Sequence, residues 1–253
     1  MKTIDVNSDL GEGFGPYRIA PDEQIFPLVT SANIACGAHA GDPMVMAQAV
    51  TLAGEHKVRI GGHVGYPDRN GFGRRALTMS LKELELETLS QLGALSAIAE
   101  HGGHRLTHAN FHGALGNLSF VDADVARTLI QAMKSFDPTL KFIGLPHTEA
   151  ALAAENAGVE TIRSFLADRG YMAAGRLAPR GTESALISDL GAVESRVAQT
   201  LSSGKLRLID GSEVPCEFDS VLVHSDTPGS VGLAHAIRRG VAAAGFEIAP
   251  YPL

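Results

Sequence analysis

Short apolar segments alternate with longer segments of helical periodicity along the chain. Such alternation is typical of parallel βαβ units, because two parallel strands need a crossover connection that is usually a helix. The pattern predicts seven strands, at residues 3–7, 28–35, 58–62, 105–110, 141–145, 159–165 and 220–223. Seven such units in 253 residues favour an α/β fold with a closed or nearly closed, TIM-like β/α barrel, in a single domain over residues 1–253.

Capping residues mark the ends of the predicted helices. Asp42 before Pro43 is a start signal, and Ser80 with Glu83 three residues later forms a capping box. Gly158 is a stop signal, because glycine accepts the left-handed conformation that often follows a helix. A short helix is expected from residues 21–22, and longer ones from residue 42 and over residues 81–100, 122–133, 148–157, 189–202 and 230–244.

Four segments between these elements lack helical periodicity. Residues 8–14 are rich in Asp, Gly and Glu and are predicted to be a loop after the first strand. Residues 63–75 form a long polar loop with several glycines, which is typical of functional rather than connecting loops. Residues 170–187 are expected to form a lid or rim loop, and residues 206–214 a hairpin that turns at Asp210-Gly211.

Composition and charge narrow the functional classes. The formal net charge is -7 and no basic run is longer than a pair, which argues against a nucleic-acid partner because phosphate contacts need clustered Lys and Arg. Only Cys36 and Cys216 are present, so no disulfide framework is expected and a reducing, cytoplasmic location is favoured. No apolar stretch resembles a signal peptide or is long enough to span a bilayer, so no membrane partner is expected.

Ionisable side chains recur where the predicted strands end. The second strand is followed by Gly, His39, Gly, Asp and Pro, and a similar sequence follows four other strands. The C-terminal ends of parallel strands meet at one mouth of a barrel, where carboxylates and imidazoles can bind a divalent metal or transfer protons. The residues predicted to share this mouth are Asp9, Glu12, His39, Asp42, His63, Asp68, His112, His147, Asp168, His224 and Asp226.

Some of these residues also have purely structural explanations. Asp42 is as well placed to cap a helix as to take part in chemistry. For Asp68 and Asn70 we favour turn formation, and His147 beside a proline is better explained as a hydrogen-bonded loop histidine. Repeated placement at strand ends favours function for Asp9, His39, His63, His112 and Asp226.

The chain has few features that bind anions. Arg74 and Arg75 follow the glycine-rich loop, where a guanidinium either binds a substrate carboxylate through two hydrogen bonds or is simply solvated. No G-x-x-x-x-G-K-[ST] motif occurs, and no G-x-G-x-x-G opens a helix after a strand. A nucleotide would therefore need another binding site.

Six motifs cover nearly the whole chain in order, at residues 5–12 (DVNSDLGE), 31–43 (SANIACGAHAGDP), 65–75 (GYPDRNGFGRR), 112–115 (HGAL), 165–169 (FLADR) and 223–228 (VHSDTP). Through them the chain resembles the LamB/YcsF family, the A subunits of bacterial 5-oxoprolinases. The resemblance implies a seven-stranded β/α barrel similar to the glycoside hydrolase/deacetylase superfamily. It also implies ATP-dependent hydrolysis of 5-oxo-L-proline to L-glutamate, with ATP and Mg²⁺ as cosubstrate and with 5-oxoprolinase subunits B and C as partners.

The chain departs from the family pattern at several positions. The family usually reads Lys-Pro-His-Gly-Ala-Leu-Tyr-Asn where this chain has Asn110 in place of the Lys and Gly116 in place of the Tyr. The usual His-Pro-Gly-Tyr and His-Gly-Asp are replaced by His63-Val-Gly-Tyr and His224-Ser-Asp. If the Lys contacts a charged group of the substrate, its loss removes an interaction of about 1.5–3 kcal/mol, and the substrate is then in question.

Five residues are assigned catalytic duties under this hypothesis. Asp9 and His112 act as base and acid, and His39 and His63 position water or an oxyanion. Asp226 is expected to orient a histidine. If a metal is bound, its candidate ligands are Asp9, His39 and His63.

Four further residues are assigned to the substrate. Arg74 is expected to bind its carboxylate, and Glu12, Asn110 and His224 are additional contacts. Two alternatives remain open. One is a metal-dependent deacetylase or other C–N hydrolase that works without ATP, and the other is a non-catalytic component that binds a small molecule.

Overall fold

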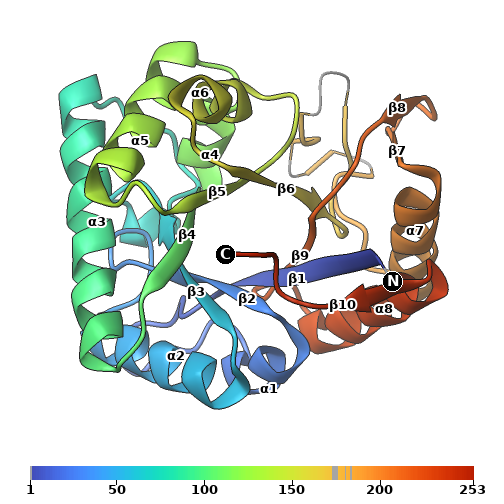
Figure 1. Cartoon of the computed structure of the whole chain (residues 1–253), viewed down its shortest axis with the longest axis horizontal. Coiled ribbons are helices and arrows are strands. Elements are labelled where there is room, and N and C mark those ends of the chain that lie inside the picture. Colours follow the sequence, from blue (N-terminus) through green and yellow to red (C-terminus); the bar gives the residue numbers. More distant parts are fainter. Residues whose placement is uncertain (1, 173–175, 180, 183) are drawn as a thin grey trace.

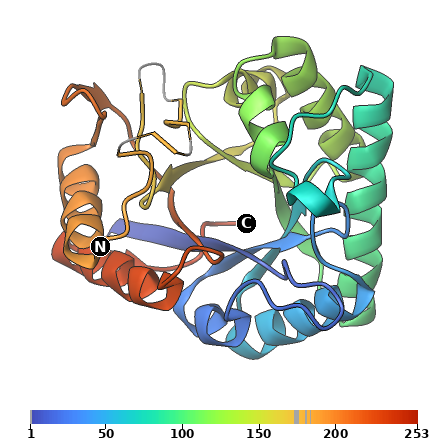
Figure 2. The ribbon, with the colours of Figure 1, turned by 180° about the vertical axis from the view of Figure 1, so that it is seen from behind.

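The computed structural model describes residues 2–172, 176–179, 181–182 and 184–253. Within them, seven parallel strands form a barrel in the order β1-β2-β3-β4-β5-β6-β9, and pairing of β9 with β1 closes it. These strands are β1 (Lys2–Leu10), β2 (Ser31–Ala35), β3 (Arg59–Val64), β4 (Leu106–Phe111), β5 (Lys141–Gly144), β6 (Thr161–Leu166) and β9 (Ser220–His224). The predicted α/β class and seven-stranded, TIM-like barrel are confirmed (Figures 1 and 2).

Helices cover the outside of the barrel, as Figures 1 and 2 show. They are α1 (Asp22–Ile25), α2 (Pro43–His56), α3 (Leu81–His101), α4 (Gly113–Ser119), α5 (Ala123–Phe136), α6 (Glu149–Ala157), α7 (Leu190–Ser203) and α8 (Ser230–Ala243). Asp42 and Asp122 accept hydrogen bonds from first-turn N–H groups, and Ser80 and Glu83 form the predicted capping box. Gly158 ends α6 with a φ of 68°. These signals are local, which is why the sequence located the longer helices well, whereas the short helix α4 was not predicted.

The first strand is longer than predicted. β1 continues through Leu10, because Asp9 pairs in register with Asn33 of β2 and with His224 of β9. The prediction that the loop begins at residue 8 is therefore wrong. The polar residues at the end of this strand resemble a loop sequence, but they are residues of a barrel strand whose side chains face inward. The second strand is shorter than predicted, since residues 26–28 form a short 3-10 helix.

Two short additions flank the barrel. The predicted hairpin consists of β7 (Lys205–Arg207) and β8 (Glu213–Pro215), which pair antiparallel. An unpredicted strand, β10 (Phe246–Ile248), pairs parallel with the start of β1. The chain then turns toward the centre of the ring of strands, where its C-terminus lies in Figure 1.

Tyr251 closes the end of the barrel opposite the mouth. Its side chain is buried with Ile143 and Ile162, and its hydroxyl lies 2.7 Å from Nδ1 of His108. Lys141 donates a hydrogen bond to the carbonyl of Pro252 at 2.7 Å. Tyr251 is therefore part of the barrel interior, whereas Pro252 and Leu253 are exposed.

The described part of residues 170–187 is anchored by a few buried residues and is otherwise largely exposed. Tyr171, Ala178 and Ala185 are buried, and bridges join residue 169 to 186 and residue 171 to 177. Residues 173–175, 180 and 183, which belong to the predicted rim loop, lie outside the described residues. No helix in the described ranges is both long enough and apolar enough to cross a membrane.

Asp22 gives the fold a testable pH dependence. Its Oδ2 accepts a hydrogen bond from the N–H of Gly11 at 3.0 Å, while Oδ1 has no partner among the described residues. Burial raises the pKa of Asp22 to about 6. Because the folded state favours the protonated form, stability falls as the pH rises from about 4 to 6 and stays lower above that range.

We therefore expect Asp22→Asn, which keeps the acceptor for Gly11, to be more stable than the wild type at pH 8 by up to about 3 kcal/mol. The difference should vanish below about pH 4, where the wild-type carboxyl is protonated in both states. Urea unfolding at pH 4, 6 and 8 measures it, with exposed Glu55→Gln as the control. An Asp22→Asn effect that is the same at all three pH values would contradict this assignment.

Candidate functional site

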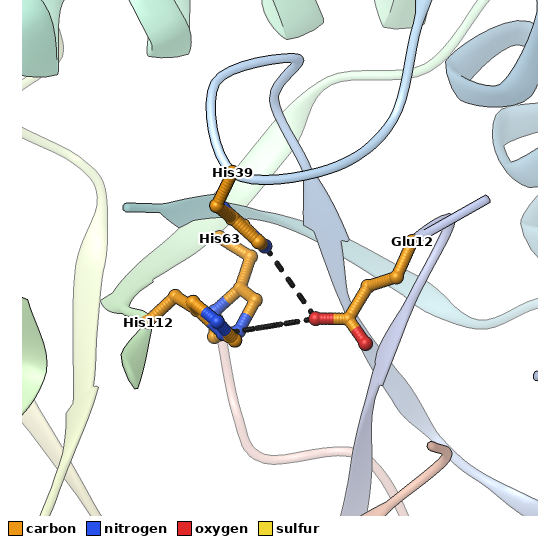
Figure 3. A group of neighbouring side chains, drawn as sticks. All are labelled: Glu12, His39, His63 and His112. Carbon is orange, nitrogen blue, oxygen red and sulfur yellow. Dashed lines mark hydrogen bonds and ion pairs between the residues drawn. The ribbon is translucent and has the colours of Figure 1, made fainter. Parts of the chain in front are cut away.

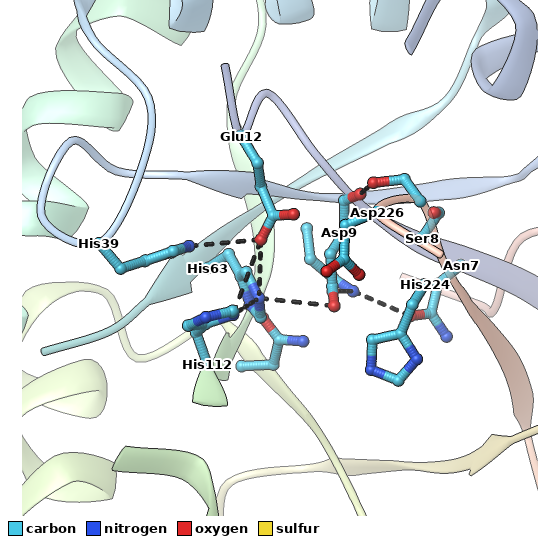
Figure 4. A network of polar contacts seen from close by, with 12 residues as sticks. Asn7, Ser8, Asp9, Glu12, His39, His63, His112, His224 and Asp226 are labelled. Atoms are coloured by element: carbon cyan, nitrogen blue, oxygen red, sulfur yellow. Dashed lines mark hydrogen bonds and ion pairs between the residues drawn. The ribbon is translucent and has the colours of Figure 1, made fainter. Parts of the chain in front are cut away.

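A cavity of about 560 Å³ opens at the C-terminal mouth of the barrel. The predicted site residues that line it are Asp9, Glu12, His63, Arg74, Asn110, His112, His224 and Asp226. His39 does not line it and is fully buried behind the rings of His63 and His112. Figure 4 shows Asp9, Glu12, His63, His112, His224 and Asp226 converging on one region from several strand ends. The structure thus brings all nine predicted catalytic and substrate-binding residues together at the mouth, and of these His39 alone has no access to the cavity.

Strand register places the polar residues of the mouth side by side. Asp9, near the end of β1, has His224 of β9 as its register neighbour. His63 of β3 pairs with Asn110 of β4, and His112 comes directly after β4 as the residue before α4. Strand ends are rigid supports, so the positions of these groups are set by the barrel rather than by loops.

Glu12 and three histidines form a compact buried cluster (Figure 3). Glu12 Oε1 lies 3.4 Å from Nε2 of His39, 3.7 Å from Nδ1 of His112 and 3.9 Å from Nε2 of His63. The rings of His39 and His112 stack with centroids 3.9 Å apart. One donor atom from each of the four residues lies within 4.8 Å of all the others.

Burial sets the charge of this cluster. It lowers the pKa of His39 and of His112 well below the usual value, and the neighbouring His63 lowers both further. Burial also raises the pKa of Glu12, to which the carboxylates of Asp9 and Asp226 add. Neutral imidazoles beside a carboxyl group are the ligand types that transition metals use. Compared with the predicted ligands Asp9, His39 and His63, the cluster includes Glu12 and His112 but not Asp9.

Asp9 is held by a hydrogen-bond chain that runs through the barrel. Its Oδ1 accepts from the side-chain amide of Asn33 at 2.9 Å, and Oδ1 of Asn33 lies 2.9 Å from Nε2 of His108. Burial lowers the pKa of His108 to about 3, so this ring is neutral. With Oδ1 fixed, Oδ2 of Asp9 lies 3.5 Å from Nε2 of His63.

Asp226 has a different partner from the one expected. Its Oδ2 forms an ion pair with Nη2 of Arg74 at 2.6 Å. Asp168 instead contacts Nδ1 of His224, at 2.9 and 2.8 Å from its two oxygens. Burial opposes ionisation of Asp168, but the charge and hydrogen bond of His224 lower its pKa below the usual value. In this structure the carboxylate that contacts His224 is therefore that of Asp168, while Asp226 pairs with Arg74.

Asp42 and Asp68 have the structural roles that were expected of them. Asp42 caps α2, and Asp68 accepts from Gly71 and forms an ion pair with Arg75. Arg75 therefore does not line the cavity, whereas Arg74 does. His147 does not line the cavity.

Sequence reasoning missed Asn33 and His108. Both lie inside the barrel, and their signal is a period of two: residues 5, 7 and 9 in β1 and residues 108 and 110 in β4 are all polar. Alternate residues of a strand share one face, so polar residues at this spacing indicate a polar barrel interior. Gly61 supports the same arrangement, because a Cβ there would lie 2.1 Å from Nε2 of His108.

Comparison with known proteins places the chain in a family. The sequence pattern of the LamB/YcsF family matches residues 4–252. The chain belongs to the LamB/YcsF family. It is 47% identical over 247 residues to the second A subunit of 5-oxoprolinase from Agrobacterium fabrum, covering 98% of this chain and 97% of that protein. It is 46% identical to the A subunit of 5-oxoprolinase from Pectobacterium atrosepticum, covering 98% and 96% of the two chains.

A solved structure agrees with this placement. The crystal structure of the lactam utilization protein from Thermus thermophilus superposes with a TM-score of 0.92 and 38% sequence identity. The match covers 98% of this chain and 99% of that one. The fold of this LamB/YcsF protein is thus shared over nearly its full length.

The structure shows the surroundings of two of the departures from the family pattern, at positions 110 and 116. Asn110 contacts the catalytic candidate His63, with its Oδ1 2.6 Å from Nδ1 of the ring. At Gly116 a Cβ would lie 2.3 Å from the carbonyl oxygen of Phe111, so this backbone accepts no side chain there. A tyrosine at position 116 would require α4 to move away from β4.

Gly73 tests how tightly the cluster is packed. It has a φ of 61°, and a Cβ there would lie 2.7 Å from Cβ of His39 and 2.8 Å from Cδ2 of His112. Gly204 has a φ of 64° with nothing within 4 Å, so it shares the backbone strain without the contact. We expect Gly73→Ala to lower the free energy of unfolding by about 1–3 kcal/mol more than Gly204→Ala. Urea denaturation measures the free energy of unfolding of both variants. Equal losses of stability would show that the side chains of the cluster can move to accommodate a Cβ at position 73.

Proposed function

We propose that this chain is the A subunit of a multi-subunit 5-oxoprolinase that hydrolyses 5-oxo-L-proline to L-glutamate with ATP. The observation that carries the proposal is the cavity at the barrel mouth, in which a fixed carboxylate, an Asp–His pair and an arginine face the same space. Relatives named as A subunits of 5-oxoprolinase match nearly the full length of this chain. The structural relative is called a lactam utilization protein, which fits a cyclic amide as substrate.

The substrate explains why ATP is needed. An unstrained lactam is stabilised by amide resonance and resists attack by water. Transfer of a phosphoryl group from ATP to the amide oxygen removes this resonance. Addition of water to the ring carbon then lets the C–N bond break as the nitrogen takes up a proton, and hydrolysis of the resulting acyl phosphate gives L-glutamate and phosphate.

Asp9 is the base in this scheme. Asn33 occupies Oδ1, so Oδ2 remains available to a water molecule in the cavity. A base fixed by a hydrogen bond to one oxygen presents the other in a constant direction, which favours proton transfer. Nε2 of His63 lies 3.5 Å from this oxygen, so the two groups border the same part of the cavity.

His224 is the proton donor to the leaving nitrogen. Sequence reasoning assigned the acid to His112, but its Nε2 lies 2.8 Å from the carbonyl of Phe72 and its Nδ1 faces His63 at 2.9 Å. His224 lines the cavity, and Asp168 fixes its Nδ1 as the protonated nitrogen. An ionised carboxylate behind an imidazole both orients the ring and stabilises its protonated form.

Arg74 binds the carboxylate of 5-oxoproline. Its guanidinium lies at the cavity, packed 4.8 Å from the ring centroid of Phe72, and its ion pair with Asp226 is about one third exposed on the arginine side. An exposed pair contributes little to stability, so exchange of Asp226 for a substrate carboxylate costs little. Asp226 holds the guanidinium in place before the substrate arrives.

The nucleotide site belongs to the partner subunits in this proposal. The sequence contains no glycine-rich phosphate-binding motif, and the net charge of -7 does not favour a triphosphate. ATP with Mg²⁺ is therefore bound by subunits B and C, which deliver the phosphorylated lactam to the cavity. The cavity of about 560 Å³ is much larger than one five-membered lactam, which leaves room for the phosphoryl group.

Reconstitution with subunits B and C tests the assignment. We expect glutamate formation that needs ATP, and a fall in kcat of about 10²–10⁴-fold for Asp9→Asn and for His224→Gln. Exposed Asp210→Asn and His104→Ala serve as controls and should keep wild-type rates. Full activity of Asp9→Asn would overturn its role. Hydrolysis without ATP would favour a deacetylase-like C–N hydrolase, and turnover without this chain would favour a non-catalytic role.

The carboxylate contact has its own test. Arg74→Gln should raise KM for 5-oxoproline about 10- to 100-fold, because a charge-assisted contact of about 1.5–3 kcal/mol is lost, with a smaller effect on kcat. Arg75→Gln is the matched control, since that guanidinium pairs with Asp68 outside the cavity. Steady-state kinetics at saturating ATP measure both. Equal effects of the two substitutions would show that Arg74 does not contact the substrate.

A further inference from the structure

The protonation of His63 is set by Asn110. Nδ1 of His63 lies 2.6 Å from Oδ1 of Asn110, an oxygen that can only accept a hydrogen bond. Nδ1 therefore carries the proton. In a neutral ring the other nitrogen, Nε2, then has a free lone pair, and this nitrogen points toward Glu12 and His112.

The protonation of His112 is set in the same way by the backbone. Its Nε2 lies 2.8 Å from the carbonyl oxygen of Phe72, so Nε2 carries the proton and Nδ1 has the free lone pair. Nδ1 of His112 and Nε2 of His63 are 2.9 Å apart. Two free lone pairs at this distance repel each other unless a proton or a metal ion lies between them.

A shared proton would leave the rest of the cluster unsatisfied. Glu12 Oε1 and both ring nitrogens of His39 are buried and have no hydrogen-bond partner among the described residues. Burying such groups unpaired costs about 1–3 kcal/mol each. A proton between His63 and His112 does nothing for Glu12 or His39, whereas a metal ion can be bound by all four residues.

We propose that Glu12, His39, His63 and His112 bind one divalent transition-metal ion, with Asn110 as the positioning residue that keeps Nε2 of His63 free for it. Three imidazole nitrogens and one carboxylate oxygen suit Zn²⁺, which prefers four ligands in a tetrahedral arrangement. A tetrahedron built from bonds of 2.0–2.1 Å has edges of about 3.3 Å. The separations of 2.9, 3.4, 3.7 and 3.9 Å lie on both sides of that value, and all four donor atoms lie within 4.8 Å of one another, so the side chains draw together when the ion binds.

The inference concerns metal binding by the isolated chain and is independent of lactam hydrolysis. Chain freed of metal with a chelator is titrated with Zn²⁺ by calorimetry, and Co²⁺ is added separately to record its visible absorption spectrum. We expect one ion per chain, a melting temperature that rises with Zn²⁺ because the ion binds the native state, and a Co²⁺ spectrum typical of a four-coordinate site.

Ligand substitutions locate the site. Glu12→Gln and His39→Ala should each weaken Zn²⁺ binding at least ~100-fold, since loss of a direct ligand exceeds the 10- to 100-fold cost of losing a supporting group. Asp9→Asn keeps its hydrogen bond to Asn33 and should stay within about 10-fold of the wild type. Circular dichroism of the metal-free variants confirms that each is folded.

Position 110 tests the positioning role. Asn110→Leu removes the acceptor for Nδ1 of His63 and should weaken binding about 10- to 100-fold, whereas Asn110→Asp keeps an acceptor oxygen and should restore it. Failure of the wild type to bind Zn²⁺ or Co²⁺, or wild-type affinity in both Glu12→Gln and His39→Ala, would overturn the proposal. A loss in Asp9→Asn as large as that in Glu12→Gln would overturn this ligand set.

Discussion

Polar side chains inside a barrel must find partners there, because an unpaired buried donor or acceptor costs about 1–3 kcal/mol. In this protein the constraint is concentrated on Asn33. Its amide nitrogen donates to Asn7 and Asp9, and its oxygen lies at hydrogen-bond distance from His108. Rotation of Asn33 would leave several buried groups unpaired at once, so the orientation of Asp9 at the mouth is determined in the middle of the barrel.

The same chain of contacts connects the two ends of the barrel. Tyr251 at the closed end contacts Nδ1 of His108, and His108 leads through Asn33 to Asp9. Each link in this chain is paired, which makes it a rigid support. The neighbouring cluster differs, because Glu12 and His39 are equally buried and have unpaired atoms. The polar groups of the hydrogen-bond chain thus satisfy one another. The unpaired atoms of Glu12 and His39 could instead bind a ligand that is not a side chain.

Local sequence patterns predicted the barrel and its helix caps because alternation and capping depend on neighbouring residues. The pattern failed at the end of β1, where Asp9 was read as part of a loop although residues 5, 7 and 9 alternate as in a strand. The partners of Asp226 and His224 could not be predicted either. They depend on the register between β6 and β9, in which Leu166 pairs with Leu222, and on the path of the loop that brings Arg74 across the mouth.

The residue at position 110 sets which ring nitrogen of His63 carries the proton. A lysine ammonium has only donors, so it cannot accept the proton of Nδ1 of His63 as Asn110 does. With lysine there, that nitrogen would have to be the acceptor, and Nε2 would carry the proton toward His112 and Glu12. The exchange of Lys for Asn therefore does more than remove a charge. It places the free lone pair of His63 on Nε2, which faces Glu12 and His112, rather than on Nδ1, which faces position 110.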